Sequence, residues 1–256
     1  MQRVLDLDLD FFIHGVASMV RFDGPRLDAD EYPPWETADV MAFLEERCHL
    51  LSTLPGRAVE HHGEVFAGWR QGLLAGDLVA PFHVTHIDAH ADLGMGENGY
   101  WHLLTEQLHL PPAERWYPRV SRDGLERAMT DGSYLAFAVG CRWISDLTIC
   151  PGGGDIHPYI MEGWEPGSGT IRMPRLTDTE LRTLMEAWAK PTFPEDRLEP
   201  PVPLTLTSRD DFFAPEPFDF VFLARSPAFT PAEADPIYDA IRERFINEAA
   251  FSPPAQ

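Results

Sequence analysis

The feature that most constrains this sequence is the run RVLDLDLDFF at residues 3–12, in which aliphatic and acidic residues alternate before two phenylalanines. Alternation with a period of two predicts a β-strand with Asp6, Asp8 and Asp10 on one face. The branched aliphatic residues and the phenylalanines indicate that this strand is buried. An edge strand with a wet face is the alternative interpretation. Three carboxylates on one face of a buried strand have no ordinary packing role, however, and therefore indicate a site.

A second run, PFHVTHIDAHADLG at residues 81–94, predicts a buried strand that ends in a polar loop containing glycine. Asp88, His90 and Asp92 alternate on one face where this strand ends. Open α/β proteins place their sites at such strand ends. Solvated acids at an exposed strand end are the alternative. We favour a bound cation, because two carboxylates and an imidazole after an apolar run would otherwise be costly to bury together.

The remaining segments alternate between helical and strand-like patterns. Helical spacing of apolar residues is present at residues 37–54, 178–190 and 231–248, and a short strand or turn leading into a helix is expected at 57–76. Further strands are expected at residues 134–144, 202–208 and 218–227. This order predicts an α/β protein with a mainly parallel sheet. No repeat divides the chain, so a single domain over residues 1–256, with a proline-rich connector at 191–203, is the simplest interpretation.

The charge balance excludes some classes of function. The chain has 41 acidic and 20 basic residues, which gives a formal net charge of −21. Such a chain lacks the basic footprint of a nucleic-acid-binding protein and favours cationic partners or metal ions. Its amino terminus has no signal-peptide pattern, and no segment approaches the about 18 apolar residues that span a membrane. We therefore expect a cytoplasmic protein that binds neither nucleic acid nor membrane.

The candidate ligands are carboxylates and imidazoles, with no thiolate among them. His61 and His62, in VEHHGEV, add a further nitrogen donor, although surface histidines at a helix start are the alternative. Oxygen and nitrogen ligands suit Mn²⁺, or Fe²⁺ or Co²⁺, better than a structural zinc ion. The donors exceed what one ion needs, whereas two ions roughly 3.5 Å apart and bridged by aspartates would use them all. We therefore expect two Mn²⁺ ions per chain.

Four motifs together resemble the ureohydrolase (arginase and agmatinase) superfamily, whose fold also includes the histone-deacetylase-like enzymes. The closer resemblance is to a bacterial family with L-D-x-D-L-D-F-F, E-x-H, H-x-D-A-H-A-D-L-G and R-S-P-x-F-T-P, found here as VLDLDLDFF, VEHHGEVF, HIDAHADLG and ARSPAFTP. Peptide arginases, which convert arginine to ornithine within ribosomally made peptides, resemble members of that family. The resemblance extends from Leu5 to about Pro231. It implies a three-layer α/β/α arginase-like fold.

Carried over residue by residue, the resemblance implies six metal ligands: Asp88, His90 and Asp92 from D-A-H-x-D, Asp8 and Asp10 from D-x-D, and His62 as the upstream histidine. Asp6 and Asp8 are the alternative D-x-D pair. We prefer Asp8 and Asp10 because they lie nearer the carboxyl end of the strand, and Asp6 would then stand behind the ligands. His61, next to the upstream histidine, is an alternate ligand.

The resemblance also implies an activity, the metal-assisted hydrolysis of a guanidino carbon–nitrogen bond in an arginine-containing peptide. Asp92 or His102 would protonate the leaving amine, although a surface histidine is the alternative for His102. Two features depart from the ureohydrolases. The D-x-D strand precedes the D-A-H-x-D strand in the chain, and ARSPAF lacks the glutamate that grips the guanidinium, which leaves Glu97 as the candidate. A hydrolase of a small guanidino or acylated-amine substrate and a non-catalytic peptide-binding scaffold are the alternative functions.

Overall fold

The computed structural model describes residues 1–17, 20, 24–94, 98–122, 125–152, 169–187 and 193–251. Its strands form one sheet of eight, in the order β5-β6-β4-β3-β1-β7-β2-β8, within these residues. Every neighbouring pair is parallel except β5 and β6, which are antiparallel. The strand bounds are β1 Arg3–Asp8, β2 Leu54–Val59, β3 Phe82–Asp88, β4 Ile144–Pro151, β5 Thr170–Ile171, β6 Val202–Leu206, β7 Phe220–Ala224 and β8 Ile246–Asn247. The predicted α/β class with a mainly parallel sheet is confirmed.

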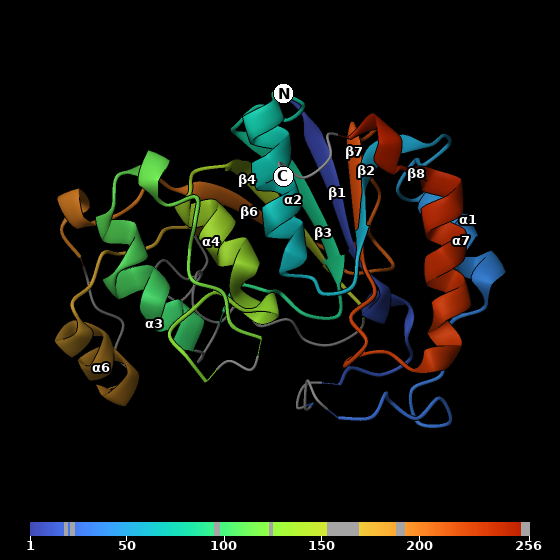
Figure 1. The fold of residues 1–256 in the computed structure, drawn as a ribbon, viewed down its shortest axis with the longest axis horizontal. Coiled ribbons are helices and arrows are strands. Elements are labelled where there is room, and N and C mark those ends of the chain that lie inside the picture. Colours follow the sequence, from blue (N-terminus) through green and yellow to red (C-terminus); the bar gives the residue numbers. More distant parts are fainter. Residues whose placement is uncertain are drawn as a thin grey trace.

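Helices cover both faces of this sheet. Their bounds are α1 Thr37–Glu46, α2 Glu64–Ala75, α3 Asn98–Thr105, α4 Tyr134–Gly140, α6 Asp178–Ala187 and α7 Asp235–Phe245. Apolar residues of α2 and α4 form one buried cluster with one face of the strands, and those of α1 and α7 form a second cluster with the other face. Figure 1 shows the two pairs of helices on opposite sides of the sheet. This arrangement is compatible with the expected three-layer α/β/α fold.

The strands that carry the two acidic motifs, β1 and β3, are neighbours in the sheet, although α1, β2 and α2 separate them in the chain. β1 pairs in parallel with β3, and the register places Asp6 opposite His86. β7 lies on the other side of β1. Because parallel strands end at the same edge of a sheet, the acidic ends of β1 and β3 meet there. The order in which the two motifs follow one another in the chain therefore does not prevent them from sharing a site.

The first strand is shorter than the sequence predicts. β1 ends at Asp8, and Leu9–Phe12 forms a 3₁₀ turn, η1. The Asp8 carboxylate accepts a hydrogen bond of 2.9 Å from the Asp10 amide and so caps this turn. Asp10 is therefore carried by the turn and not by the strand face, although it is as buried as Asp8.

The strand expected at residues 134–144 is wrong. Tyr134–Gly140 is the helix α4, and the strand β4 begins only at Ile144. All seven helical residues are buried, so the helix shows no polar face in its sequence. A short, uniformly apolar run has no periodicity that separates a buried helix from a buried strand. A 3₁₀ turn, Asp131–Ser133, comes directly before α4, and Thr130 and Ser133 form a reciprocal capping box in that turn.

The other expected elements are present with shifted ends. The segment at 57–76 contains the end of β2 and the helix α2, which closes on Gly76 in the left-handed conformation (φ 84°). The expected helices at 37–54, 178–190 and 231–248 correspond to α1, α6 and α7. Residues 193–203 of the proline-rich connector contain a 3₁₀ turn and the start of β6. None of the helices in the described ranges is long and apolar enough to cross a membrane.

Candidate metal centre

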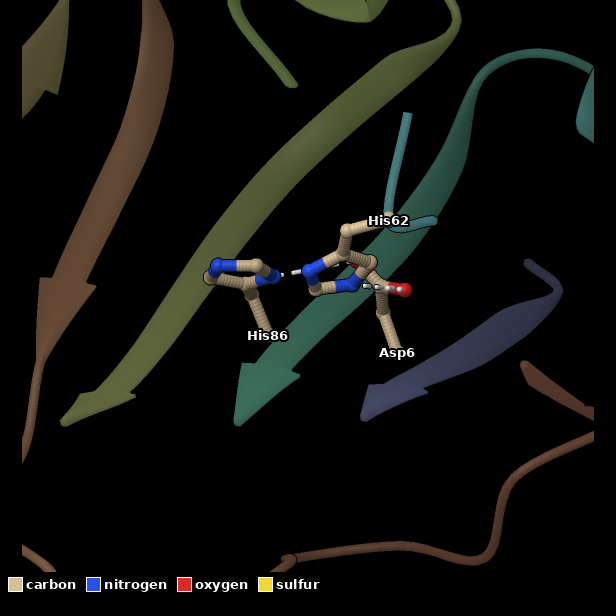
Figure 2. Close-up of side chains that lie close together, drawn as sticks. All are labelled: Asp6, His62 and His86. Carbon is tan, nitrogen blue, oxygen red and sulfur yellow. Dashed lines mark hydrogen bonds and ion pairs between the residues drawn. The ribbon is translucent and has the colours of Figure 1, made fainter. Parts of the chain in front are cut away.

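A group of buried acidic and histidine side chains lies where β1 and β3 end. Asp6 and Asp8 come from β1, His86 and Asp88 from β3, and His62 from the turn between β2 and α2. Each of these five residues is no more than 3% exposed. Figure 2 shows the Asp6 carboxylate of β1 beside the imidazole of His62, with His86 reaching across from β3. We call these residues, together with Asp10, His90 and Asp92, the acidic centre.

Three carboxylates surround one nitrogen of His62. Its Nδ1 lies 3.0 Å from Asp8 Oδ2, 2.9 Å from Asp88 Oδ2 and 3.0 Å from Asp92 Oδ2. None of these contacts has hydrogen-bond geometry, so this buried nitrogen has no hydrogen-bond partner among the described residues. A single N–H could in any case satisfy only one of the three carboxylates. Such an arrangement of one nitrogen and three oxygens is the donor set of a divalent cation.

Asp6 fixes the orientation of two histidines. Its Oδ1 lies 3.2 Å from His62 Nε2, and its Oδ2 lies 3.0 Å from His86 Nδ1. When both of these nitrogens donate to Asp6, the opposite nitrogens are left with lone pairs. These are His62 Nδ1 and His86 Nε2, and His86 Nε2 lies 3.3 Å from Asp88 Oδ2 without a hydrogen bond. Histidines that bind a metal commonly donate the N–H of their other ring nitrogen to a carboxylate, which fixes the orientation of the imidazole. Here the single carboxylate of Asp6 contacts two such imidazoles.

A second group of donors adjoins the first. His90 Nδ1 lies 2.9 Å from Asp10 Oδ2 and 3.5 Å from Asp88 Oδ1. Its other nitrogen, Nε2, donates to the carbonyl of Ala17 at 3.0 Å, which leaves the lone pair on Nδ1. Asp88 therefore turns Oδ2 toward His62 and Oδ1 toward His90. Its carboxylate is common to both groups.

The acidic centre has more negative charge than its histidines balance. Burial raises the pKa of Asp10 well above its ordinary value, and the Asp8 and Asp88 carboxylates raise it further. Burial and the Asp88 carboxylate likewise raise the pKa of Asp92 to about 7. For Asp6, burial raises the pKa, but contacts with His62 and His86 outweigh it and hold the pKa below its ordinary value.

Burial and the neighbouring charges act on the pKa values of the three imidazoles in the opposite directions. Burial lowers the pKa of His62, His86 and His90, but the surrounding carboxylates outweigh burial and raise all three values. Protons on these histidines thus provide part of the positive charge that the carboxylates need. A metal ion could take the place of those protons, and the buried His and Asp groups of the centre could hold one.

The structure brings most of the expected ligands together and separates two other candidates, His61 and His102, from them. Asp8, Asp10, His62, Asp88, His90 and Asp92 all belong to the acidic centre, and Asp6 stands behind two of its histidines. His61 turns toward Asp131 instead, with 3.6 Å between His61 Nδ1 and Asp131 Oδ2. His102, on α3, contacts Glu106 and Arg119 through Nδ1, at 3.1 and 3.0 Å. None of the contacts recorded for His102 reaches the acidic centre within the described chain, and Glu97 lies outside the described residues.

Sequence reasoning missed three residues that contact the acidic centre. His86 carried a signal, because it extends the alternation of Asp88, His90 and Asp92 by one step along β3. Tyr134 carried none, since its segment was expected to be a strand, yet its hydroxyl donates to Asp6 Oδ2 at 2.5 Å. Ser226, in the ARSPAFTP motif, donates its hydroxyl to Asp8 Oδ2 from a backbone with φ 47°. A non-glycine residue in that conformation is uncommon and is often found at functional sites.

The acidic centre therefore has the donors, the burial and the excess negative charge of a site for a metal ion, at the edge of the sheet where α/β proteins bind their ligands. Its motifs are the ones that resemble the ureohydrolases. Comparison of this chain with family models, with curated proteins and with solved structures finds no match in any of the three.

Proposed function

We propose that this protein is a metal-dependent hydrolase of guanidino carbon–nitrogen bonds that converts arginine within peptides to ornithine and releases urea. The observation that carries the proposal is His62 Nδ1, a buried nitrogen with three carboxylate oxygens about it and no hydrogen bond. The resemblance of the surrounding motifs to the ureohydrolases supplies the reaction. The net charge of −21 favours the approach of a basic, arginine-bearing peptide.

The donors support two cation positions. Asp8, His62, Asp88 and Asp92 would hold one ion, and Asp10, Asp88 and His90 would hold the other. Oxygen-rich sites with one imidazole each suit Mn²⁺, with Fe²⁺ or Co²⁺ as alternatives. The Asp88 carboxylate, whose Oδ2 faces His62 and whose Oδ1 faces His90, would contribute a donor to each position.

The residues of the chain would divide the remaining tasks. Divalent cations at such a site supply Lewis acidity and bring the pKa of water to about 7. Asp6 would hold the His62 imidazole with its Nδ1 lone pair toward one cation, and would keep the His86 imidazole beside Asp88. A carboxylate oxygen of Asp92 would accept a proton from water and deliver it to the leaving amine. One water is consumed: its oxygen goes to urea, and both of its hydrogens go to the ornithine amine, which leaves as an ammonium group while urea keeps the two NH2 groups of the guanidinium.

A second candidate is a hydrolase of acylated amines. One observation favours it: in ARSPAF an arginine, Arg225, stands where the ureohydrolases have their guanidinium-binding glutamate. Its Nε lies 3.5 Å from Glu60 Oε1, and its guanidinium lies 4.4 Å from the centre of the Tyr238 ring. A cation at this position would repel a guanidinium, whereas it would not repel an acyl group.

A substrate assay with mass-spectrometric detection tests both candidates. Protein loaded with Mn²⁺ is offered an arginine-containing peptide, free arginine, agmatine and an acetyl-lysine peptide, with Asp88→Ala as the inactive control. We expect the arginine peptide to lose its amidine group with release of urea, and free arginine to remain unchanged. Turnover of free arginine or agmatine alone would show that the substrate is a small guanidine and not a peptide. Deacetylation alone would establish the second candidate, and metal binding without any turnover would contradict both and leave a peptide-binding scaffold.

A further inference from the structure

The segment TDGSY, residues 130–134, contacts three separate parts of the chain that carry the candidate ligands. It lies between Met129 and the start of α4 and contains the 3₁₀ turn η4 (Asp131–Ser133). The segment contributes no ligand of its own to the groups that could hold a metal. Its contacts nevertheless reach the turn that bears His62, the loop that follows Asp92, and the Asp6 carboxylate.

The first contact holds the turn of His62. Asp131 Oδ1 accepts a hydrogen bond of 3.0 Å from the amide of Gly63, the residue after His62. Asp131 Oδ2 lies 3.6 Å from His61 Nδ1, on the other side of His62. A side chain at position 63 would bring its Cβ within 2.7 Å of Asp131 Oδ1, so the approach requires glycine. The same carboxylate thus contacts both neighbours of His62.

The second contact holds the loop that bears Asp92. The carbonyl of Gly132 accepts a hydrogen bond of 2.8 Å from the amide of Gly94, two residues beyond Asp92. Asp92 itself has a left-handed backbone, with φ 47°. The hydrogen bond at Gly94 therefore ties the loop that bears Asp92 to the segment.

The third contact holds Asp6. The Tyr134 hydroxyl donates to Asp6 Oδ2 at 2.5 Å and lies 3.0 Å from His62 Nε2. Tyr134 is fully buried, and its ring packs against the ring of His62 with 4.8 Å between their centres. The tyrosine therefore limits the rotation of the carboxylate that orients both His62 and His86.

The segment is itself rigid enough to hold these parts. The Ser133 hydroxyl accepts from the Thr130 amide at 2.8 Å, and the Ser133 amide donates to the Thr130 carbonyl at 3.2 Å. Both residues are buried. The helix α4, which is buried along its whole length, continues directly from the turn and anchors it in the core.

We propose that residues 130–134 form a brace that sets the positions of the metal ligands, with Tyr134 and Asp131 as positioning residues. This inference rests on the metal centre of the proposed function. Without the Tyr134 hydroxyl, Asp6 can rotate, His62 and His86 lose their fixed orientation, and a cation must order them when it binds. Loss of such a supporting partner typically weakens metal binding by about 10- to 100-fold.

The test measures metal binding, so it does not depend on a substrate. Mn²⁺ affinity is determined by isothermal titration calorimetry, and the ligand geometry is followed by the visible absorption spectrum of the Co²⁺-loaded protein. We expect Tyr134→Phe to bind Mn²⁺ about 10- to 100-fold more weakly and to change the Co²⁺ spectrum. Tyr238→Phe is the matched control, because Tyr238 is also buried and also loses one hydrogen bond, to the Val59 carbonyl at 3.1 Å. It should leave both readouts unchanged.

A pair of variants at Asp131 separates the brace from a general loss of stability. Asp131→Asn keeps an oxygen that can accept from Gly63, whereas Asp131→Ala removes it. We expect the alanine variant to bind Mn²⁺ weakly and the asparagine variant to recover most of the affinity. Wild-type affinity and an unchanged Co²⁺ spectrum in Tyr134→Phe and Asp131→Ala would overturn the brace and leave the metal centre standing. A wild-type protein that binds no divalent cation would overturn the metal centre itself.

Discussion

Two groups of charged side chains in this molecule, one around the buried Glu199 and the other the acidic centre, differ in whether protein groups alone satisfy their charges and hydrogen bonds. Around Glu199, which is 4% exposed, every charge has a partner. Arg115 donates to both carboxylate oxygens of Glu199 at 3.0 Å, and Arg142 donates to one of them at 3.0 and 3.1 Å. The remaining donors of Arg115 reach the carbonyls of Leu108, Leu110 and Gly140. This group is satisfied by the protein alone.

The acidic centre is not satisfied in this way. It gathers carboxylates from Asp6, Asp8, Asp10, Asp88 and Asp92, with three histidines as the only cationic groups in contact with them among the described residues. Two of its imidazole nitrogens, His62 Nδ1 and His86 Nε2, are buried without a hydrogen bond.

The difference in hydrogen bonding between the two groups suggests different roles: stabilising the fold for the Glu199 group, and binding a ligand for the acidic centre. A buried ion pair with complete hydrogen bonding needs nothing further, and its removal affects folding. A buried group with surplus carboxylates and unpaired lone pairs is costly unless something else binds to it. The contrast therefore predicts that substitutions in the first group change stability, and that substitutions in the second change ligand binding.

The largest effect is expected from Asp88→Ala in the acidic centre. Asp88 is common to both groups of donors, so its loss should weaken Mn²⁺ binding well beyond the about 100-fold cost of a lost supporting partner. Turnover should fall to the level of the buffer. The metal-free protein should remain folded, because the three histidines keep other carboxylate partners: His62 and His86 contact Asp6, and His90 contacts Asp10. Calorimetric titration with Mn²⁺ and thermal unfolding of the metal-free form measure the two effects, and tight Mn²⁺ binding by the variant would contradict this role for Asp88.

Glu199→Ala should produce the opposite result. It leaves the buried guanidinium of Arg115 without its carboxylate partner, which typically costs about 3–5 kcal/mol of unfolding free energy. Its Mn²⁺ affinity, measured below the unfolding transition, should equal that of the wild type. Urea denaturation of the metal-free protein gives the free energy of unfolding. A loss below about 1 kcal/mol, which is typical of exposed pairs, would show that this pair does not act as a buried one.

The two groups also differ in how far the sequence predicts them. The acidic strands could be predicted because their alternation is local: Asp6 and Asp8 on β1, and Asp88 at the end of β3, follow from a period of two. Their adjacency could not be derived from spacing, since β1 and β3 are separated in the chain by β2 and two helices. The order of strands in a parallel sheet depends on how the crossovers pack, and a local pattern does not contain that information.

The contacts between distant segments were beyond sequence reasoning. Tyr134 reaches Asp6 across 128 positions of the chain, and Arg115 reaches Glu199 across 84. The contact of Tyr134 was harder still to predict, because α4 is buried on every side and its sequence does not distinguish a helix from a strand. His86 is different, since its place in the alternation of β3 was visible in the sequence and only its role was not.

Metal addition should stabilise the protein through the acidic centre alone. An ion that binds only the folded state stabilises it by about 2.7 kcal/mol at a concentration 100 times its dissociation constant. We therefore expect Mn²⁺ to raise the melting temperature of the wild type and a chelator to reverse the change. The melting temperature of Glu199→Ala, although lower without metal, should rise by the same amount when Mn²⁺ is added. The melting temperature of Asp88→Ala should not change. Equal shifts in all three proteins would place the binding site elsewhere.

The two groups should finally respond to pH in different ranges. His62, His86 and His90 must lose their protons to bind a metal, and the surrounding carboxylates raise the pKa of each, so protons compete with the metal through neutral pH. Because the pKa of His86 is raised to about 10 and that of His90 to about 12, Mn²⁺ affinity should rise through neutral pH and still be rising at about pH 9, by about tenfold per unit for each proton displaced. For Glu199, burial raises the pKa, but Arg115 outweighs it and lowers the pKa below the ordinary 4.5, so that its stabilising effect is present above that value and lost only in acid. Titrations in buffers of different ionisation enthalpy count the released protons, and an affinity that does not change with pH would show that the histidines are not ligands.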